Sequence, residues 1–302
     1  MAITRVSTYA MHQTTLGDVT RLQANLAKLQ NQISSGVKAN DFEGLNGQVE
    51  TFVQFEGKIK KTQTFIENNT VTLSRMQTTD VALDQIISIA DDFQDLLIQR
   101  RNPVSGDSLQ FEISARAMLE ATAAQLNTAQ EGRFLFGGTR TNIPPVTTPV
   151  PGSNSIGVPD DGYYVGNDTN LFARVQETFE VQYNVRANEA GFQKLFAAMN
   201  MGLSADASGS QDQLVAATTL VTEALDEIIS VRARVQQNIV NVEEINERHE
   251  QLNLYWKGLN EKIIKTDLLS ASTEVAMGEA ILQASFSSFS RLNQLRLTDF
   301  LR

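Results

Sequence analysis

The sequence predicts a mainly α-helical fold, an elongated coiled-coil rod of N- and C-terminal helices with a small β-rich insert at its tip. Three observations support this fold class. Residues 211–302 contain no proline and only two glycines, Gly258 and Gly278. Apolar residues near both chain ends recur at alternating intervals of three and four, the spacing of a coiled-coil seam. Five of the six prolines, which exclude helix, fall in one central stretch: Pro144, Pro145, Pro149, Pro151 and Pro159.

The longest predicted helix begins at Gln211 and ends near Lys265. At ~1.5 Å per residue, helix over the whole C-terminal stretch would be on the order of 130 Å long. Such a helix cannot bury its own apolar stripe, so we expect other long helices to pack against it. The predicted seam skips Asn238 and consists of Leu214, Ala217, Val221, Ala224, Ile228, Val231, Val235, Val242, Ile245, Leu252, Trp256, Leu259 and Ile263.

An N-terminal amphipathic helix is expected to end at Gly36, because glycine accepts the left-handed conformation that terminates helices. Its stripe is Val19, Leu22, Leu26, Leu29 and Ile33. The following stretch, residues 36–47, is rich in glycine, asparagine and aspartate, which predicts a loop.

The next predicted helix runs from Gln48 to Arg101 and ends before Pro103, since the residue preceding a proline is displaced from helical geometry. Polar residues at some of its heptad positions, such as Asn69 and Asp80, are interpreted together with Asn238 as residues that set the register of the packing. The expected seam is Phe52, Phe55, Ile59, Ile66, Leu73, Met76, Leu83, Ile87, Ala90 and Leu97, with Thr62, Asn69, Asp80 and Gln94 at the polar positions.

Asp107 is expected to cap a further helix that reaches Gln130. The predicted apolar face of this helix is Leu109, Ile113, Ala117 and Leu126.

Residues 132–209 are expected to form the β-rich insert. The alternation of apolar and polar residues from Phe179 to Val185 predicts a half-buried strand. The other expected elements are short strands at residues 134–136 and 163–165, a short amphipathic helix at 191–201 and a polar linker at 202–209.

A second helix boundary is predicted at Lys265–Asp267, where a Thr/Asp pair can cap a new helix. Both chain ends are amphipathic and carry few charges, and a thin apolar stripe on an isolated helix is marginal in water. We therefore expect the two ends to pair with each other and with neighbouring copies. The predicted assembly interface consists of Leu16, Val19, Leu22, Leu26, Leu29, Ile33, Leu282, Phe286, Phe289, Leu292 and Phe300.

Three domains follow from these boundaries. Residues 1–40 with 266–302 would form a terminal coiled-coil assembly domain, residues 41–131 with 211–265 a helical rod domain, and residues 132–210 an outer β-rich domain.

Composition excludes several classes of function. The net charge of −10 at pH 7 argues against a nucleic-acid partner, which requires a basic face. The absence of cysteine excludes disulfides and thiolate metal sites. No apolar run reaches the ~18 residues of a membrane span, and the first twenty residues lack the features of a cleavable secretion signal.

Candidate chemistry is sparse, so we expect no enzymatic activity, no cofactor and no metal. His12 and His249 lie in different predicted helices, and His249 is expected to pack on a seam. The carboxylates Asp91, Asp92 and Asp95 are expected to be solvated, and Asp160-Asp161-Gly162 predicts a turn. Trp256 is expected to pack between helices.

Several local motifs resemble those of the bacterial flagellin family. The stretch Leu29–Asp41 is similar to the loop after the first helix in that family, and Leu297–Leu301 to its short aliphatic close. The sequence Gly132-Arg-Phe-Leu-Phe-Gly-Gly-Thr-Arg-Thr141, followed by Pro144-Pro145, resembles the motif of the hook–filament junction members. So do Gly162–Asp168 and Phe192–Phe196. The loop at Asp41–Leu45 departs from the family because it lacks the usual fuller run of acidic residues and alanines.

This resemblance implies a structural protein of the flagellum that assembles into a ring between hook and filament. It implies contacts with other copies, with flagellin and with the other hook-associated junction protein. It also implies export through the flagellar secretion apparatus to an extracellular site, after a chaperone has held the C-terminal helix.

Two other readings compete with a junction protein. Flagellin itself, the filament subunit, would have the same helical ends. A secreted helical pore-forming protein could also combine long helices with a β insert, but it should carry a continuous apolar hairpin, which the sequence lacks.

Overall fold

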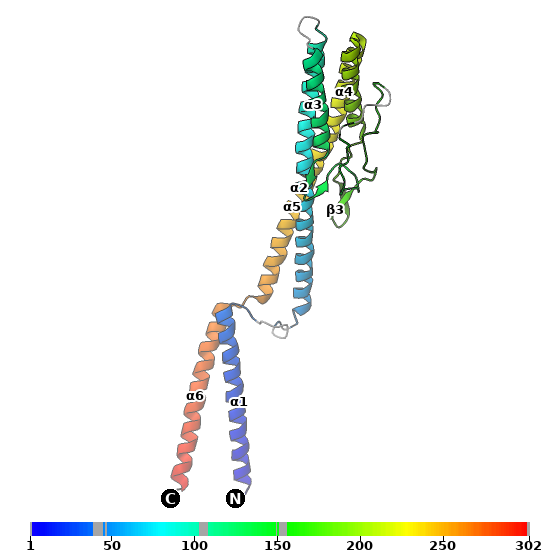
Figure 1. Cartoon of the computed structure of the whole chain (residues 1–302). Coiled ribbons are helices and arrows are strands. Elements are labelled where there is room, and N and C mark those ends of the chain that lie inside the picture. The colour runs from blue at the N-terminus through cyan, green and yellow to red at the C-terminus, as the bar shows by residue number, and fades with distance from the viewer. Residues whose placement is uncertain are drawn as a thin grey trace. The chain divides into compact units, whose positions relative to one another are not determined.

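The chain is mainly α-helical, as predicted. The structure is a computed structural model that describes residues 2–38, 45, 47–102, 108–148, 150 and 156–300. It divides into two compact units, Met1–Lys60 with Asn253–Arg302 (unit 1) and Lys61–Leu252 (unit 2). The described elements, shown in Figure 1, are α1 (Ala2–Ser35), α2 (Val49–Arg100), α3 (Ser108–Leu126), β1 (Ala129–Gln130), β2 (Arg133–Phe134), β3 (Phe172–Gln176), β4 (Phe179–Gln182), α4 (Ala190–Ser208), α5 (Gln211–Ile264) and α6 (Leu268–Phe300).

The predicted seam of α5 is buried from Leu214 to Ile245 without exception. Asn238, which the seam skips, donates from Nδ2 to the carbonyl oxygen of Gln182 at 3.0 Å. Beyond Ile245 the seam is partly wrong, because Leu252 is 40% exposed while Asn253 is buried. His249 is buried, as expected. The Asn253 Nδ2 donates to the carbonyl of Ile59 at 3.1 Å, so a satisfied amide replaces the expected leucine.

The buried face of α2 is wider than the predicted seam. Met76, Leu83, Ala90 and Leu97 are buried as expected, but Ala82, Ile86 and Phe93 are buried as well. A broad apolar face is typical of a helix that packs against several neighbours, whereas a two-helix seam is narrower. This part of α2 therefore belongs to a multi-helix core.

The predicted apolar face of α3 was partly wrong. Leu126 is buried as expected, but Ile113 is 62% exposed and Ala117 is exposed, and the side chain of Leu109 lies outside the described part. The other buried residues of α3 were not predicted: Phe111, Ala115, Leu119, Thr122 and Ala123. The helix also ends four residues earlier than predicted, because Ala129 and Gln130 pair with β2. The predicted cap at Asp107 lies outside the described residues.

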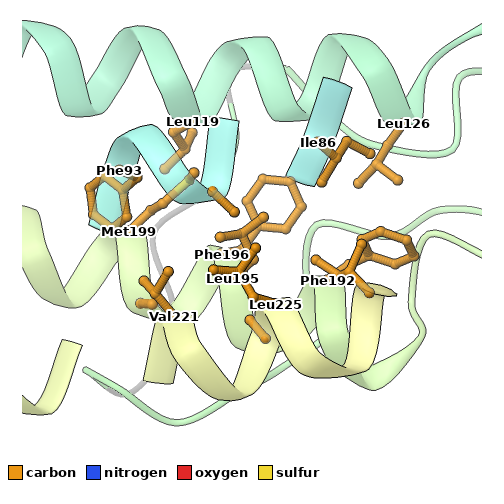
Figure 2. Packing of buried hydrophobic residues seen from close by; sticks show 14 of the residues in the cluster. Ile86, Phe93, Leu119, Leu126, Phe192, Leu195, Phe196, Met199, Val221 and Leu225 are labelled. Carbon is orange, nitrogen blue, oxygen red and sulfur yellow. The ribbon is translucent and has the colours of Figure 1, made fainter. Parts of the chain in front are cut away.

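One hydrophobic core joins α2, α3, α4 and α5 in unit 2, and it includes residues from the segment between β2 and α4 (Figure 2). Aromatic rings connect these elements. Phe93 of α2 lies 6.5 Å from Phe111 of α3, and Phe136 meets Phe192 of α4 edge-on. Burying such a ring contributes ~1.5–3 kcal/mol. The predicted boundaries of a separate outer domain stay a prediction.

Helix α4 is longer than expected, so the predicted linker at residues 202–209 is wrong. The helix continues to Ser208 and ends at Gly209, whose φ of 69° is left-handed. Gly202 has a packing role within the helix, since a Cβ there would lie 3.0 Å from Phe93 Cζ and 3.1 Å from Leu97 Cδ2. The small residues that suggested a linker instead allow close helix packing.

The two sheets formed by the described residues are both antiparallel hairpins. β1 pairs with β2, and β3 pairs with β4, with a register shift between Arg174 and Gln176. The sequence did not predict β3, and β4 ends at Gln182, short of the predicted Val185. The strand expected at residues 163–165 is only an isolated bridge between Val146 and Tyr164.

The helix boundaries predicted in unit 1 are confirmed. Gly36 has a φ of 73°, and its N–H donates to the carbonyl of Gln32 at the end of α1. Asp267 caps α6, with its Oδ1 accepting from the N–H groups of Leu269 at 3.0 Å and Ser270 at 3.2 Å.

Candidate assembly surfaces

Helices α1 and α6 lie side by side in unit 1 (Figure 1). Leu26 and Ala271 are buried, at 7% and 5% exposure. Gly278 allows the contact, because a Cβ there would lie 2.7 Å from Leu26 Cδ2. The two helices therefore approach each other closely at Leu26 and Gly278.

The residues predicted to form the assembly interface are unequally covered by this pairing. Among the predicted residues whose side chains are described, only Leu26 is buried, while Leu16 is 57% and Phe286 53% exposed. Val19, Leu22, Leu29, Ile33 and Leu282 are half-buried. The side chains of Phe289, Leu292 and Phe300 lie outside the described part. The two helices thus leave much of their apolar surface open, and its use in assembly stays a prediction.

Helix α6 carries further exposed apolar residues that the prediction missed. Leu269, Met277 and Ile281 are 79%, 67% and 47% exposed. Their spacings of eight and four place them on one helical face, and this spacing was the signal available in the sequence. Phe286 lies nine residues after Met277, on the opposite side of the helix, so α6 carries exposed apolar residues on both sides.

The segment that follows α1 and the segment between α5 and α6 bind each other through backbone groups. The Lys38 N–H donates to the carbonyl of Ile264 at 2.7 Å, and the Thr266 N–H donates to the carbonyl of Gly36 at 3.0 Å. Val37 and Lys265 form the corresponding antiparallel bridge. The ends of α1 and α5 are thereby fixed to each other.

Trp256 packs between α2 and α5, as expected. Its ring is stacked on Phe55 at 5.5 Å between centroids, and the Lys58 ammonium lies 4.0 Å above it. Tyr255 contacts the same indole edge-on and is itself 57% exposed. This cluster stabilises the packing of α2 against α5 in unit 1 and leaves the Tyr255 ring at the surface.

The glycine-rich motif at residues 132–141 has a structural role. Gly138 has a φ of 64°, and the Thr139 N–H donates to Asn167 Oδ1 at 2.8 Å. The Arg140 Nη1 donates to the carbonyl of Val165 at 3.0 Å. The motif therefore folds back on the Tyr163–Asp168 segment, which the sequence had marked separately.

Tyr163 anchors that segment in the core of unit 2. Its ring packs 4.4 Å from Phe196, and its hydroxyl donates to the carbonyl of Ala187 at 2.8 Å. Burial, together with the nearby Asp161 and Asp160, raises the pKa of Tyr163 well above its usual value. The phenol is thus held as a neutral hydrogen-bond donor.

The described residues contain few groups suited to catalysis. They include no cluster of three or more His, Cys, Asp or Glu side chains that could hold a metal ion. His249 is buried, stacked on Phe65 at 5.2 Å, and its Nε2 donates to the carbonyl of Val175 at 3.0 Å. Asp91, Asp92 and Asp95 are exposed, and Asp160 Oδ1 accepts from the Gly162 N–H in the predicted turn. The side chain of His12 lies outside the described part.

Ion pairs add fixed contacts between the long helices of unit 2. Arg232 of α5 binds Asp80 at 2.9 Å and Asp84 at 2.5 Å, both on α2. The hydrogen bond that Arg232 donates to Asp80, reinforced by the charges of both carboxylates, raises the Arg232 pKa above its usual value. Asp80 therefore forms an ion pair between α2 and α5, and its effect on the register of the two helices stays a prediction.

No helix among the described residues combines the length and the apolar character needed to cross a membrane.

Comparison with known proteins adds a family match and two structural similarities. Residues 6–141 match the family model of the bacterial flagellin N-terminal helical region. The fold is similar to that of Bacillus cereus FlgL, with a TM-score of 0.56 and 16% identity over 70% of this chain and 99% of that one. It is also similar to a structure described as a flagellar hook-associated protein from Vibrio parahaemolyticus, with a TM-score of 0.52 and 14% identity over 74% of this chain and 98% of that one. No curated protein sequence matches the chain significantly.

Proposed function

We propose that this protein, which belongs to the bacterial flagellin family, is a structural subunit of the flagellum. Its proposed position is the junction between hook and filament. In this role the protein forms a ring by self-assembly and catalyses no reaction. It contacts another hook-associated protein on one side and flagellin on the other.

The observation that carries this proposal is the open apolar surface of the α1–α6 pair. Exposed side chains such as Leu16, Met277 and Phe286 are costly in water, since burial of each would contribute ~1.5–3 kcal/mol. Contiguous exposed apolar surface on a folded protein typically marks an interaction site. A ring of identical subunits would cover these residues from both sides.

Two observations favour a junction protein over a filament subunit. One of the two solved structures compared above is described as a flagellar hook-associated protein and the other as FlgL, and their fold covers most of this chain. The Gly132 motif, with its contacts to the Tyr163–Asp168 segment, is the sequence feature that resembles junction proteins. Flagellin remains the competing candidate because the matched family model describes the flagellin N-terminal region.

The same proposal includes the route to the assembly site. The subunit would leave the cell through the flagellar secretion apparatus, with a chaperone covering α6 beforehand. The exposed residues of α6, with Leu269 at 79%, are the surface such a chaperone would protect.

Deletion of the gene in its host, followed by electron microscopy, tests the proposed position. We expect hooks without filaments and flagellin released into the medium, and re-expression should restore filaments. Normal filaments in the deletion strain would refute the proposal. The purified protein provides a second test, because seeded growth of long filaments by this protein alone would identify a filament subunit instead.

A further inference from the structure

We propose that Arg75 and Arg133 form a binding site for a carboxylate group in unit 2. Both arginines line a cavity of about 20 Å³ where α2 meets β2 and the segment before α4. A single water needs ~10–15 Å³, so this cavity holds a group of only a few atoms. None of the described residues that line it is an aspartate or glutamate.

The state of Arg75 points to an anionic ligand. Its side chain is only 21% exposed, and its Nε is buried without a hydrogen-bond partner among the described residues. A buried donor without a partner costs ~1–3 kcal/mol, more when the group is charged. A bound carboxylate would accept from this N–H and neutralise the guanidinium.

The nearest carboxylate of the chain does not fill this role. Glu131 Oε2 lies 3.9 Å from Arg75 Nη2, beyond hydrogen-bond distance, and the Glu131 side chain is 70% exposed. It contacts the outer end of the guanidinium and leaves the Nε unpaired. The pair is therefore a weak surface interaction.

Among the other lining residues, Thr141 and Tyr183 carry neutral hydroxyl groups, so the arginines are the charged donors. Asn184 already accepts from the Leu171 N–H at 2.7 Å and donates to the Thr169 carbonyl at 3.3 Å. The Thr79 hydroxyl donates to the Arg75 carbonyl at 2.9 Å. Arg133 is exposed, so the second guanidinium lies at the accessible side of the site. Planar guanidinium groups bind carboxylates with two parallel hydrogen bonds.

The carboxylate has two sources, a small free anion or an acidic side chain of another copy of this chain. The excess of acidic residues, 35 against 25 basic ones, makes such side chains abundant on every copy. The inference does not depend on the proposed flagellar role.

Arginine Nε–Hε signals in NMR spectra of the full-length protein provide the test. The Arg75 signal is identified by its loss in Arg75→Lys, and Arg116, which pairs with Glu112 on the exposed side of α3, serves as the internal reference. Sodium acetate is the probe, with sodium chloride at equal ionic strength as the control. We expect the Arg75 signal to shift saturably, with half-saturation on the order of 0.1–10 mM, while the Arg116 signal shifts at least tenfold less.

Two further measurements identify the source of the carboxylate and show whether the inference is wrong. A shift of the Arg75 signal that grows with protein concentration, without acetate, would assign the carboxylate to another copy. Glu131→Gln removes the competing carboxylate and should tighten acetate binding about two- to fivefold. If acetate shifts the Arg75 signal only in Glu131→Gln, then Glu131 already occupies the site in solution and the inference is wrong. Equal shifts of Arg75 and Arg116, or none, would also overturn it.

Discussion

At the residue scale, Glu131 adopts a backbone conformation that suits glycine or asparagine better. It occupies the two-residue turn between β1 and β2 with a φ of 52°, followed by Gly132 at 75°. Two consecutive positive φ angles define a type I′ turn, for which Asn-Gly is the preferred sequence. We expect Glu131→Asn to raise the free energy of unfolding by about 0.5–1 kcal/mol.

Urea unfolding of unit 2, followed by the burial-sensitive signals of its tyrosines, measures this effect. Glu131→Gln is the matched control, because it removes the charge and keeps the strain. If Gln stabilises as much as Asn, the gain comes from the charge and the conformational explanation fails.

The buried ion pair between Arg100 and Asp206 gives a second residue-scale prediction. The two side chains are 18% and 5% exposed, and they join α2 to the last turns of α4. Removing one partner of a buried pair leaves an uncompensated charge, which costs ~3–5 kcal/mol. We expect Asp206→Ala to lower the stability of unit 2 by about 3 kcal/mol in urea unfolding.

A double variant separates the charge effect from lost packing. Arg100→Met combined with Asp206→Leu removes both charges and should recover most of the loss. If the double variant is as unstable as Asp206→Ala, then packing around Asp206 dominates.

Sequence reasoning could not find this ion pair. Asp206 lies among small and polar residues that resemble a linker, and its partner is 106 residues away. Local composition carries no information about such a partner, whereas the seam of α5 could be predicted because spacing alone determines a helical face.

At the element scale, Gly202 controls how closely α4 approaches α2 and α3. Its absent side chain faces Phe93, Leu97 and Phe111. A methyl group there would force these side chains apart, and overpacking of a dense core costs ~1–3 kcal/mol. We expect Gly202→Ala to lower the melting temperature of unit 2.

Gly258→Ala is the matched control within another long helix. A Cβ at Gly258 meets nothing within 4 Å, so alanine should be neutral or stabilising by up to ~1 kcal/mol through helix propensity. A melting temperature unchanged or raised in Gly202→Ala would show that the core adapts, contrary to the packing argument.

The β3–β4 hairpin depends on buried polar side chains from the two long helices. Asn69 of α2 donates from Nδ2 to the Val175 carbonyl at 3.1 Å, and His249 of α5 donates to the same oxygen. Asn69→Ala leaves one of these bonds unmade, at ~1–3 kcal/mol. We expect amide hydrogen exchange of residues 173–181 to accelerate about 5- to 100-fold.

Gln63→Ala, which removes only an exposed contact to Glu67 on α2, should leave this exchange unchanged. Equal acceleration in both variants, or in neither, would contradict a specific role for Asn69. The sequence marked Asn69 and Asn238 as polar residues within a seam, but it did not predict β3, the strand that Asn69 holds.

The different outcomes for α3 and α5 have a physical reason. In α5 apolar residues follow one spacing, so a single face is available for burial. In α3 both faces carry apolar residues, Ile113 on one and Phe111 with Leu119 on the other. Periodicity cannot choose between two apolar faces, and the packing of α4 and α2 against the aromatic face decides.

At the scale of the whole molecule, the chain combines a dense core in unit 2 with open apolar helices in unit 1. Unit 2 buries large side chains completely, including Phe93, Phe136 and Phe192. The α1–α6 pair leaves Leu16 and Phe286 more than half exposed. Stability and assembly should therefore respond to different substitutions.

Leu16→Glu combined with Phe286→Glu tests this separation. Both positions are exposed in the single chain, so we expect thermal stability to change by less than roughly 0.5 kcal/mol each. Assembly should be lost, because two carboxylates per subunit would have to be buried without partners at several kcal/mol each. Sedimentation velocity of the protein and filament formation in a complemented deletion strain measure these effects.

Ile113→Glu is the matched control, since this residue is 62% exposed on α3 in unit 2. It should preserve both stability and assembly. Loss of assembly in the control alone would place the interface on α3. Unchanged assembly in the double variant would show that the open surface of α1 and α6 is not the assembly interface. The experiment thus distinguishes an interface from surface that is merely exposed, because all three substitutions add the same charge to solvent-accessible apolar positions.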